Sequence, residues 1–297
     1  MATPSLDRLA ADTAMGAVTL RVADLDRMTA YYRDAVTLTV LAADGSRAVL
    51  GRGGTPVVVL EHAPELRHAS PRDAGLFHTA ILFDTQADLA AAVHSVARRH
   101  PQSFTGSADH LVSQAFYFDD PEGNGVELYW DRDRSTWSWV HGQVEMDSLM
   151  LDPSAFLREH LTEEAAAAAP TRPGRVGHVH LSVGDVATAR EFYVDRLGFE
   201  TTATFGPQAL FVSAGGYHHH MAMNTWRSRG AGRRQMTLGL GQVRILLPGD
   251  DDLGALDERL RHHGIATEHD GRTLGFADPW GNAIEVATPA TPAAAAR

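Results

Sequence analysis

The sequence predicts an α+β fold that is built from four βαβββ modules in two domains. The first observation behind this prediction is a repeated turn. Residues 120–127, Asp-Pro-Glu-Gly-Asn-Gly-Val-Glu, return 158 positions later (285 − 127) as Asp-Pro-Trp-Gly-Asn-Ala-Ile-Glu at 278–285. The second is a repeated strand and helix start, in which residues 18–25 match residues 179–186 at an offset of 161 (185 − 24). The third is a common order of strand-like and helix-like segments in the two halves of the chain, which indicates an internal duplication.

The first and third modules, residues 16–66 and 176–228, open in the same way. Each begins with a short alternating strand, passes through an aspartate and enters a segment whose apolar residues have helical spacing. Aspartate is a favoured helix N-cap, so Asp24 and Asp185 are expected to begin the two helices.

The second and fourth modules, residues 75–132 and 236–288, share another pattern. Each has a first strand, a helix and then the repeated turn, which leads into a last strand. The expected first strands and helices are 76–83 and 87–99 in the second module, and 240–247 and 253–263 in the fourth.

The modules group into halves that are joined by a linker. The predicted N-terminal domain, linker and C-terminal domain are 1–134, 135–175 and 176–297. A helix is expected over 152–169, followed by the Pro-Thr-Arg-Pro-Gly-Arg breaker at 170–175. The Ala- and Pro-rich tail 289–297 is predicted to be disordered.

The composition narrows the class of protein. A hydrophobic fraction of 44% supports a packed core, and a formal net charge of −11 argues against a phosphate-tracking surface for nucleic acid. The absence of cysteine excludes disulfides and thiolate ligands, and sixteen histidines point to metal or acid–base chemistry. No secretory signal and no stretch of roughly 20 apolar residues is visible. We therefore expect a cytoplasmic protein that is not membrane-bound.

The module order resembles the vicinal oxygen chelate superfamily, which includes glyoxalases, bleomycin-resistance proteins and extradiol dioxygenases. The resemblance covers residues 16–287 apart from the linker. It implies that paired modules form curled mixed sheets around a cavity. It also places metal ligands on the first strand of each module and near the end of a last strand.

The resemblance implies different ligand sets for different pairings of the modules. Only the pairing of modules two and three supplies two histidines and a carboxylate, a set that can hold one face of an iron(II) ion and leave the other face open. We therefore expect these modules to share the working cavity and modules one and four to form a structural relic. The sets for pairings one–two, three–four and two–three are Ala17/His78/Glu127, His178/Gln242/Glu285 and His78/Glu127/His178.

Further residues match the extradiol dioxygenase pattern. His110, Tyr117 and the following turn to Glu127 fit the family motif, with Ala108 as a minor departure from it. The run Tyr-His-His-His at 217–220 corresponds to apolar residues in module one and resembles a family histidine pair, which places the acid–base role on His219. The resemblance makes His110 and Tyr117 hydrogen-bonding partners of the substrate.

Two aromatic residues are expected next to these side chains. We expect His180 and Trp226 to contact the substrate, although His180 also suits a core position beside His178. Residues 215–221 are expected in a strand, which would turn His219 away from its two neighbours and leave those at the surface or behind the ligands.

Simpler roles exist for several residues. A single histidine on an apolar strand is commonly a core residue, and Glu127 would suit a buried ion pair if a cation lay nearby. The following structural roles are expected: Glu285 paired with an arginine or solvated, His262 and His263 solvent-facing, and Trp137 and Trp139 as packing anchors.

The resemblance implies an iron(II)-dependent extradiol dioxygenase that cleaves the ring of a catechol-type diol with O₂, in the catabolism of aromatic hydrocarbons. Manganese(II) accepts the same ligands, and the sequence does not fix a homo-oligomer. Two other functions stay open. One is a glyoxalase-like metal-dependent isomerase or lyase that uses His178, Gln242 and Glu285, and the other is a metal-free small-molecule binding protein of the resistance type.

Overall fold

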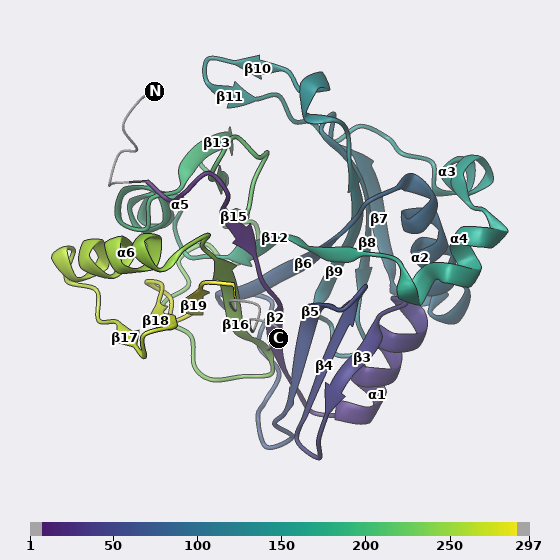
Figure 1. The fold of residues 1–297 in the computed structure, drawn as a ribbon, viewed down its shortest axis with the longest axis horizontal. Coiled ribbons are helices and arrows are strands. Elements are labelled where there is room, and N and C mark those ends of the chain that lie inside the picture. The colour runs from purple at the N-terminus through teal and green to yellow at the C-terminus, as the bar shows by residue number, and fades with distance from the viewer. Residues whose placement is uncertain (1–7, 290–297) are drawn as a thin grey trace, which may run out of the picture.

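Two curled mixed sheets, each made of one module from each half of the chain, form the body of the protein (Figure 1). The computed structural model describes residues 8–289, so the predicted disorder of 290–297 lies outside the described residues. The α+β fold of four βαβββ modules around a cavity is confirmed, and so is the pairing of module two with three and of one with four.

The first sheet has eight strands in the order β13-β14-β15-β12-β6-β9-β8-β7. Module three supplies β12 (Gly174–Ser182), β13 (Glu200–Phe205), β14 (Ala209–Ser213) and β15 (Met221–Asn224). Module two supplies β6 (Gly75–Phe83), β7 (Phe104–Asp109), β8 (Ser113–Asp119) and β9 (Gly125–Asp131). The two modules join where β12 pairs antiparallel with β6.

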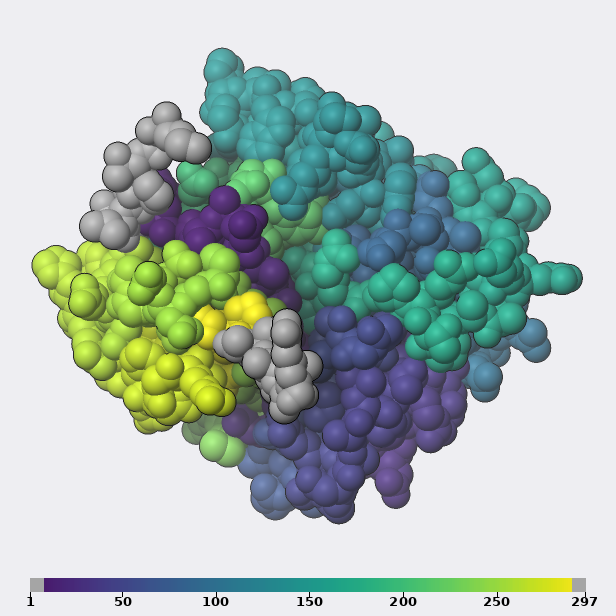
Figure 2. All heavy atoms as spheres, viewed as in Figure 1, coloured from purple at the N-terminus to yellow at the C-terminus, as the bar shows by residue number. Residues whose placement is uncertain are grey.

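The second sheet has nine strands and joins modules one and four through the pairing of β2 with β16. Module one supplies β2 (Val18–Val22), β3 (Thr39–Ala43), β4 (Arg47–Arg52) and β5 (Thr55–His62). Module four supplies β16 (Gly239–Leu246), β17 (Glu268–His269), β18 (Thr273–Ala277) and β19 (Ala283–Ala287). Strand β1 (Ala14–Met15) pairs with β16, and Figure 2 shows this N-terminal region as a purple band between module four and the linker.

The helices begin where the sequence predicts caps. Asp24 accepts the backbone N–H of Arg27 at 3.0 Å, and Asp185 accepts that of Thr188 at 2.7 Å. The helices of modules one and three, α1 (Leu25–Ala30) and α5 (Val186–Arg190), continue as π-helical turns at Tyr31–Ala35 and Glu191–Arg196. The helices of modules two and four are α2 (Gln86–Arg99), followed by a 3-10 turn at Pro101–Ser103, and α6 (Asp250–His262).

The repeated turns connect the two sheets. In each turn the aspartate accepts two backbone N–H groups and the following asparagine amide, which fixes the turn. The Tyr32 hydroxyl donates to Asp120 at 3.0 Å, and the Tyr193 hydroxyl donates to Asp278 at the same distance. Because each tyrosine belongs to one sheet's module and each aspartate to the other's, the two buried bonds tie the sheets together.

The linker differs from its prediction in two ways. The expected single helix is two helices, α3 (Pro153–His160) and α4 (Glu163–Ala168), because the Thr162 side chain caps a new helix by accepting the N–H of Ala165. Residues 135–151 also form a hairpin that was not predicted, of β10 (Trp139–Val140) and β11 (Gln143–Val144). Short 3-10 turns lie at Arg134–Thr136 and Ala169–Thr171.

Only one of the two linker tryptophans is the expected packing anchor. Trp137 is buried against Val112, Val144 and Tyr217, and its indole N–H donates to the Arg132 carbonyl. Trp139 is 42% exposed because the hairpin holds it on the outer surface, so its predicted packing role was wrong.

Gly177 interrupts the register between β12 and β6 one residue before His178. A Cβ at this position would lie 1.7 Å from the Tyr129 hydroxyl oxygen. The missing side chain therefore allows the Tyr129 hydroxyl to pass over β12 beside His178.

We expect Gly177→Ala to lower the free energy of unfolding by about 1–3 kcal/mol, because the added methyl overpacks a buried site. Gly254→Ala in α6 is the matched control, because nothing lies within 4 Å of its added Cβ. It should stabilise the protein by about 0.5–1 kcal/mol. Urea unfolding of both variants measures the difference, and equal stability of the two would contradict the packing role of Gly177.

Candidate metal centre

A cavity of about 1020 Å³ lies in the curve of the eight-stranded sheet. Residues of modules two and three form most of its wall, with contributions from the loop at residues 68–74 and from the linker. All of the site residues predicted from the sequence line this cavity: His78, Glu127, His178, His219, His110, Tyr117, His180 and Trp226.

Strand register brings the predicted ligands together. Across β9, β6 and β12, Glu127 and His178 are both paired with Ala80, so the three residues form one row on the concave face. His78 lies two positions along β6 from Ala80 and therefore on the same face. Because the side chain of Ala80 is small, the space above it is free for the side chains of His78, Glu127 and His178.

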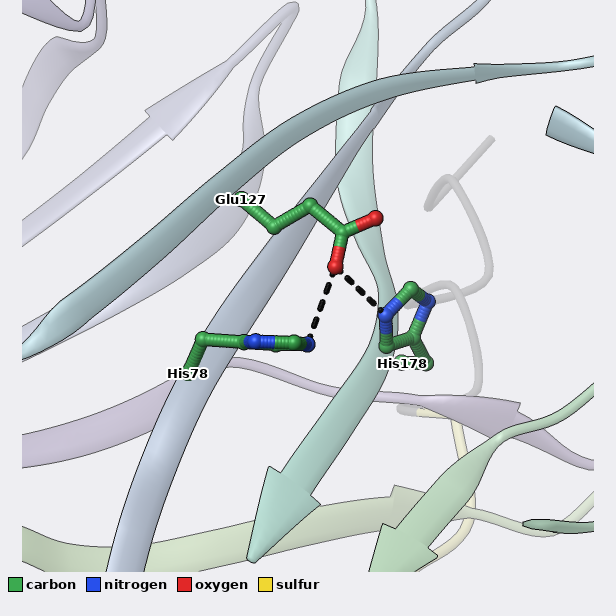
Figure 3. Close-up of side chains that lie close together, drawn as sticks. All are labelled: His78, Glu127 and His178. Carbon is green, nitrogen blue, oxygen red and sulfur yellow. Dashed lines mark hydrogen bonds and ion pairs between the residues drawn. The ribbon is translucent and has the colours of Figure 1, made fainter. Parts of the chain in front are cut away.

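The three side chains converge on one Glu127 oxygen (Figure 3). Oε2 lies 2.9 Å from Nε2 of His78 and 3.1 Å from Nε2 of His178, and the candidate ligand atoms all lie within 4.8 Å of one another. His78 is 6% exposed, and Glu127 and His178 are each 2% exposed. Among the described residues this is the one cluster of three His, Cys, Asp or Glu side chains with such spacing.

The geometry fits a metal ion better than a pair of hydrogen bonds. Nε2 of His78 has no hydrogen-bond partner despite its 2.9 Å distance to Glu127, since the ring N–H does not point at the oxygen. Neighbouring donors at right angles and about 2.1 Å from one ion would lie about 3.0 Å apart, close to both separations. Two imidazoles and one carboxylate on one face are typical of non-haem iron(II) sites with open positions.

The electrostatics favour the protonation states that a metal needs. Burial alone would raise the pKa of Glu127, but the adjacent His178 and His78 bring that pKa well below its usual range. Burial lowers the pKa of His178 to about 4 even beside Glu127. A carboxylate and neutral imidazoles are the forms that bind metal ions.

His219 lies beside the triad, although the expected strand around it was wrong. Residues 214–220 form a turn with bends, because Gly215 and Gly216 both adopt positive φ and end β14 early. The His219 ring lies on the His178 ring with 4.0 Å between centroids. Burial lowers the pKa of His219 well below its usual value, so the imidazole is neutral.

The neighbours of His219 are buried as well, so of their two expected positions the one at the surface is wrong and the one behind the ligands stays. His218 is fully buried and its Nδ1 lies 2.7 Å from Nδ1 of His219, so the two side chains do not diverge as in a strand. His220 accepts the backbone N–H of Ala214 at Nδ1.

His110 and Tyr117 contact each other at the cavity wall. Nδ1 of His110 donates to the Asp147 carbonyl of the linker at 2.7 Å, and its Nε2 lies 2.7 Å from the Tyr117 hydroxyl. In a neutral His110, Nε2 therefore accepts a hydrogen bond from the Tyr117 hydroxyl. The Tyr117 oxygen can then act as a hydrogen-bond acceptor toward the cavity. Burial raises the pKa of Tyr117 well above its usual value, so the hydroxyl keeps its proton.

His180 belongs to an aromatic wall next to His78. Its Nε2 accepts the Asn224 amide at 3.0 Å, and the Asn224 oxygen accepts the N–H of Trp226, which fixes the amide orientation. Ring centroids of Phe77 lie 4.9 Å from His180 and 5.2 Å from Trp226. Trp226 is 46% exposed and lies at the edge of the cavity.

The alternative ligand sets are not brought together. Ala17, Gln242 and Glu285 belong to the modules of the nine-stranded sheet, while His178 lies in the eight-stranded sheet. Glu285 pairs with Arg244 at 2.9 Å and accepts the Gln242 amide at 3.4 Å, as expected for a carboxylate without a metal. His262 and His263 are exposed, as predicted.

Sequence reasoning missed Asp131, Tyr129 and Asn224. Glu127, Tyr129 and Asp131 alternate along β9 and share one face, a signal that the period of a strand could have supplied. Nothing in the sequence indicated that Asn224 would meet His180, because that contact depends on the parallel pairing of β12 with β15.

The family model described as the glyoxalase/bleomycin resistance protein/dioxygenase superfamily matches residues 14–128 and 175–286. The catechol-2,3-dioxygenase of Bacillus subtilis (strain 168) is 34% identical over 278 residues, which cover 90% of this chain and 94% of the relative.

Two solved structures show the same fold. A proposed dioxygenase from Bacillus subtilis subsp. subtilis str. 168 has a TM-score of 0.64 at 14% identity, covering 96% of this chain and 87% of that one. Glyoxalase I from Zea mays has a TM-score of 0.54 at 16% identity, covering 93% of this chain and 92% of that one. No helix among residues 8–289 is long and apolar enough to cross a membrane.

We expect His78→Ala to abolish metal binding, because it removes one of three donors from a buried set. The test is anaerobic titration with iron(II) or manganese(II), measured as bound metal and as the rise in melting temperature that a ligand of the native state produces. Glu285→Ala is the matched control in the other sheet and should bind metal as the unmodified protein does. Equal binding by both variants would contradict the assignment.

Proposed function

The chain belongs to the glyoxalase/bleomycin resistance protein/dioxygenase superfamily, and on this basis we propose that it is an iron(II)-dependent extradiol dioxygenase that opens the ring of a catechol-type aromatic diol with O₂. The observation that carries the proposal is the convergence of His78, Glu127 and His178 in one cavity. The name of the Bacillus subtilis relative supports the substrate class. The proposed role is in the breakdown of aromatic compounds in the cytoplasm.

Two features separate this proposal from the alternatives. A glyoxalase-like reaction through His178, Gln242 and Glu285 lacks a shared site, because those residues lie in different sheets. A metal-free binding protein would have no need for a buried carboxylate between two imidazoles, which is costly without a cation. Iron and manganese accept the same donors, and the metal titration distinguishes them by occupancy and activity.

His78, Glu127 and His178 would hold the metal, which would supply Lewis acidity toward the diol and O₂. The remaining residues of the chain bind the substrate and move protons. The triad residues are almost completely buried, and the wall of Phe77, His180 and Trp226 offers aromatic surface against which a ring can stack.

His219 is suited to be the acid–base residue. Its Nδ1 is occupied by His218, which leaves Nε2 for the substrate. A neutral, buried imidazole can accept a proton from a diol hydroxyl and return it later in the reaction. The Tyr117 oxygen can accept a hydrogen bond from the second substrate hydroxyl while its own O–H donates to His110.

We expect the iron-loaded protein to convert catechol into a yellow ring-fission product when air is admitted. Absorbance of the product measures the rate, and oxygen uptake gives the stoichiometry. Loss of the substrate without a ring-opened product, or no reaction across a panel of substituted catechols in protein that binds iron, would count against the proposal.

His219→Phe should retain iron and lower kcat by roughly 100-fold or more, the usual scale for a missing acid–base group. His262→Phe on the exposed end of α6 is the matched control and should turn over catechol at the unmodified rate. Unchanged turnover in His219→Phe would remove His219 from the reaction.

A further inference from the structure

A chain of hydrogen bonds leads from His219 away from the cavity. Nδ1 of His219 lies 2.7 Å from Nδ1 of His218, and Nε2 of His218 lies 2.8 Å from Oδ1 of Asp131. His219 lines the cavity, whereas His218 and Asp131 are not part of its wall. The function proposed above uses His219 and gives no role to the two residues behind it.

The chemistry of the donors limits how protons can be placed along this chain. A carboxylate only accepts, so Nε2 of His218 must carry the proton that it donates to Asp131. A neutral His218 then has a bare Nδ1, which can only accept. His219 must therefore donate from Nδ1, and its own Nε2 is left without a proton.

The surroundings of His218 hold its ring in place. The ring is fully buried among aromatic side chains, with centroids 4.1 Å from Tyr217 and 5.3 Å from Trp137. It also lies 5.9 Å from the ring of His178.

The carboxylate at the end of the chain is itself held in place. The Tyr217 hydroxyl donates to Oδ2 of Asp131 at 2.7 Å, and the hydroxyls of Tyr217 and Tyr129 are 2.7 Å apart. Both oxygens of Asp131 are thus occupied by buried donors, which directs Oδ1 at His218. The Asp131 side chain itself is only 18% exposed.

We propose that Asp131 and His218 are positioning residues that fix His219 in the tautomer with its proton on Nδ1. The role rests on the proposed function, because a bare Nε2 matters only if His219 accepts a proton from substrate. The arrangement prepares the imidazole as a base before the diol arrives. After proton transfer the carboxylate, one ring away, stabilises the charge on His219 through His218.

The tautomer can be measured without activity. Two-bond ¹H–¹⁵N correlation spectra of metal-free protein with ¹⁵N-labelled histidine distinguish protonated from bare ring nitrogens, and the signals missing from His219→Phe identify His219. We expect a protonated Nδ1 and a bare Nε2 in the unmodified protein. A proton on Nε2 of His219 would overturn the proposal whether or not the protein is a dioxygenase.

Asp131→Asn is the informative variant, because it keeps the size of the side chain and can donate from its amide to Nε2 of His218. The reversed chain would place the His219 proton on Nε2. We expect the spectrum to show this change, and kcat to fall by about 10- to 100-fold while KM and bound iron stay close to normal.

Two controls separate positioning from general damage. Tyr217→Phe removes a buried hydrogen bond from the other oxygen of Asp131 and should lower kcat far less than Asp131→Asn. In the His219→Phe background, Asp131→Asn should lower kcat no further, because the two residues act as one unit. An equal loss in Tyr217→Phe, additive losses in the double variant, or an unchanged His219 spectrum in Asp131→Asn would each overturn the proposal.

Discussion

A carboxylate that is almost completely buried between two imidazoles is the constraint on which the arrangement of the site depends. Glu127 loses its hydration when it is buried in the sheet. The Nε2 atoms of His78 and His178 lie near one of its carboxylate oxygens and replace only part of the lost interaction with water. The register of β6, β9 and β12, the small side chain of Ala80 and the bare backbone of Gly177 all serve to bring these groups together. Burial lowers the pKa values of His178, His180 and His219, and the pKa of Glu127 is also held below its usual range, so the site suits a divalent cation.

The duplication explains why one sheet carries this chemistry and the other does not. Both sheets have the same connectivity and the same buried tyrosine–aspartate bond at their turns. In the nine-stranded sheet Ala17 and Gln242 occupy the positions of the two histidines, and Arg244 neutralises the remaining carboxylate. The charge partner of Glu285 is thus an arginine whose side chain is 44% exposed.

The sequence was sufficient for the four modules, their pairing across the halves and the convergence of His78, Glu127 and His178. The modules follow from repeated patterns that could be compared position by position, whereas their pairing and the ligand set were implied by the resemblance to the vicinal oxygen chelate superfamily. It was insufficient around His218–His220, where two left-handed glycines replace the expected strand, and in the linker, where Thr162 starts a second helix. Such features depend on single backbone angles and on partners far along the chain. The Asp131–His218–His219 contacts join β9 to a turn in the other half of the chain, so no local pattern could have shown them.

Pairing across the halves also has a consequence for biosynthesis. When the ribosome has completed β9, two of the three triad residues exist, but the edge of β6 that later receives β12 has no partner. An unpaired apolar strand edge invites association with other chains, and contacts between segments this distant form slowly. The edge of β6 therefore stays unpaired while the linker is synthesised. A chaperone that binds exposed strand edges would act most usefully in this interval.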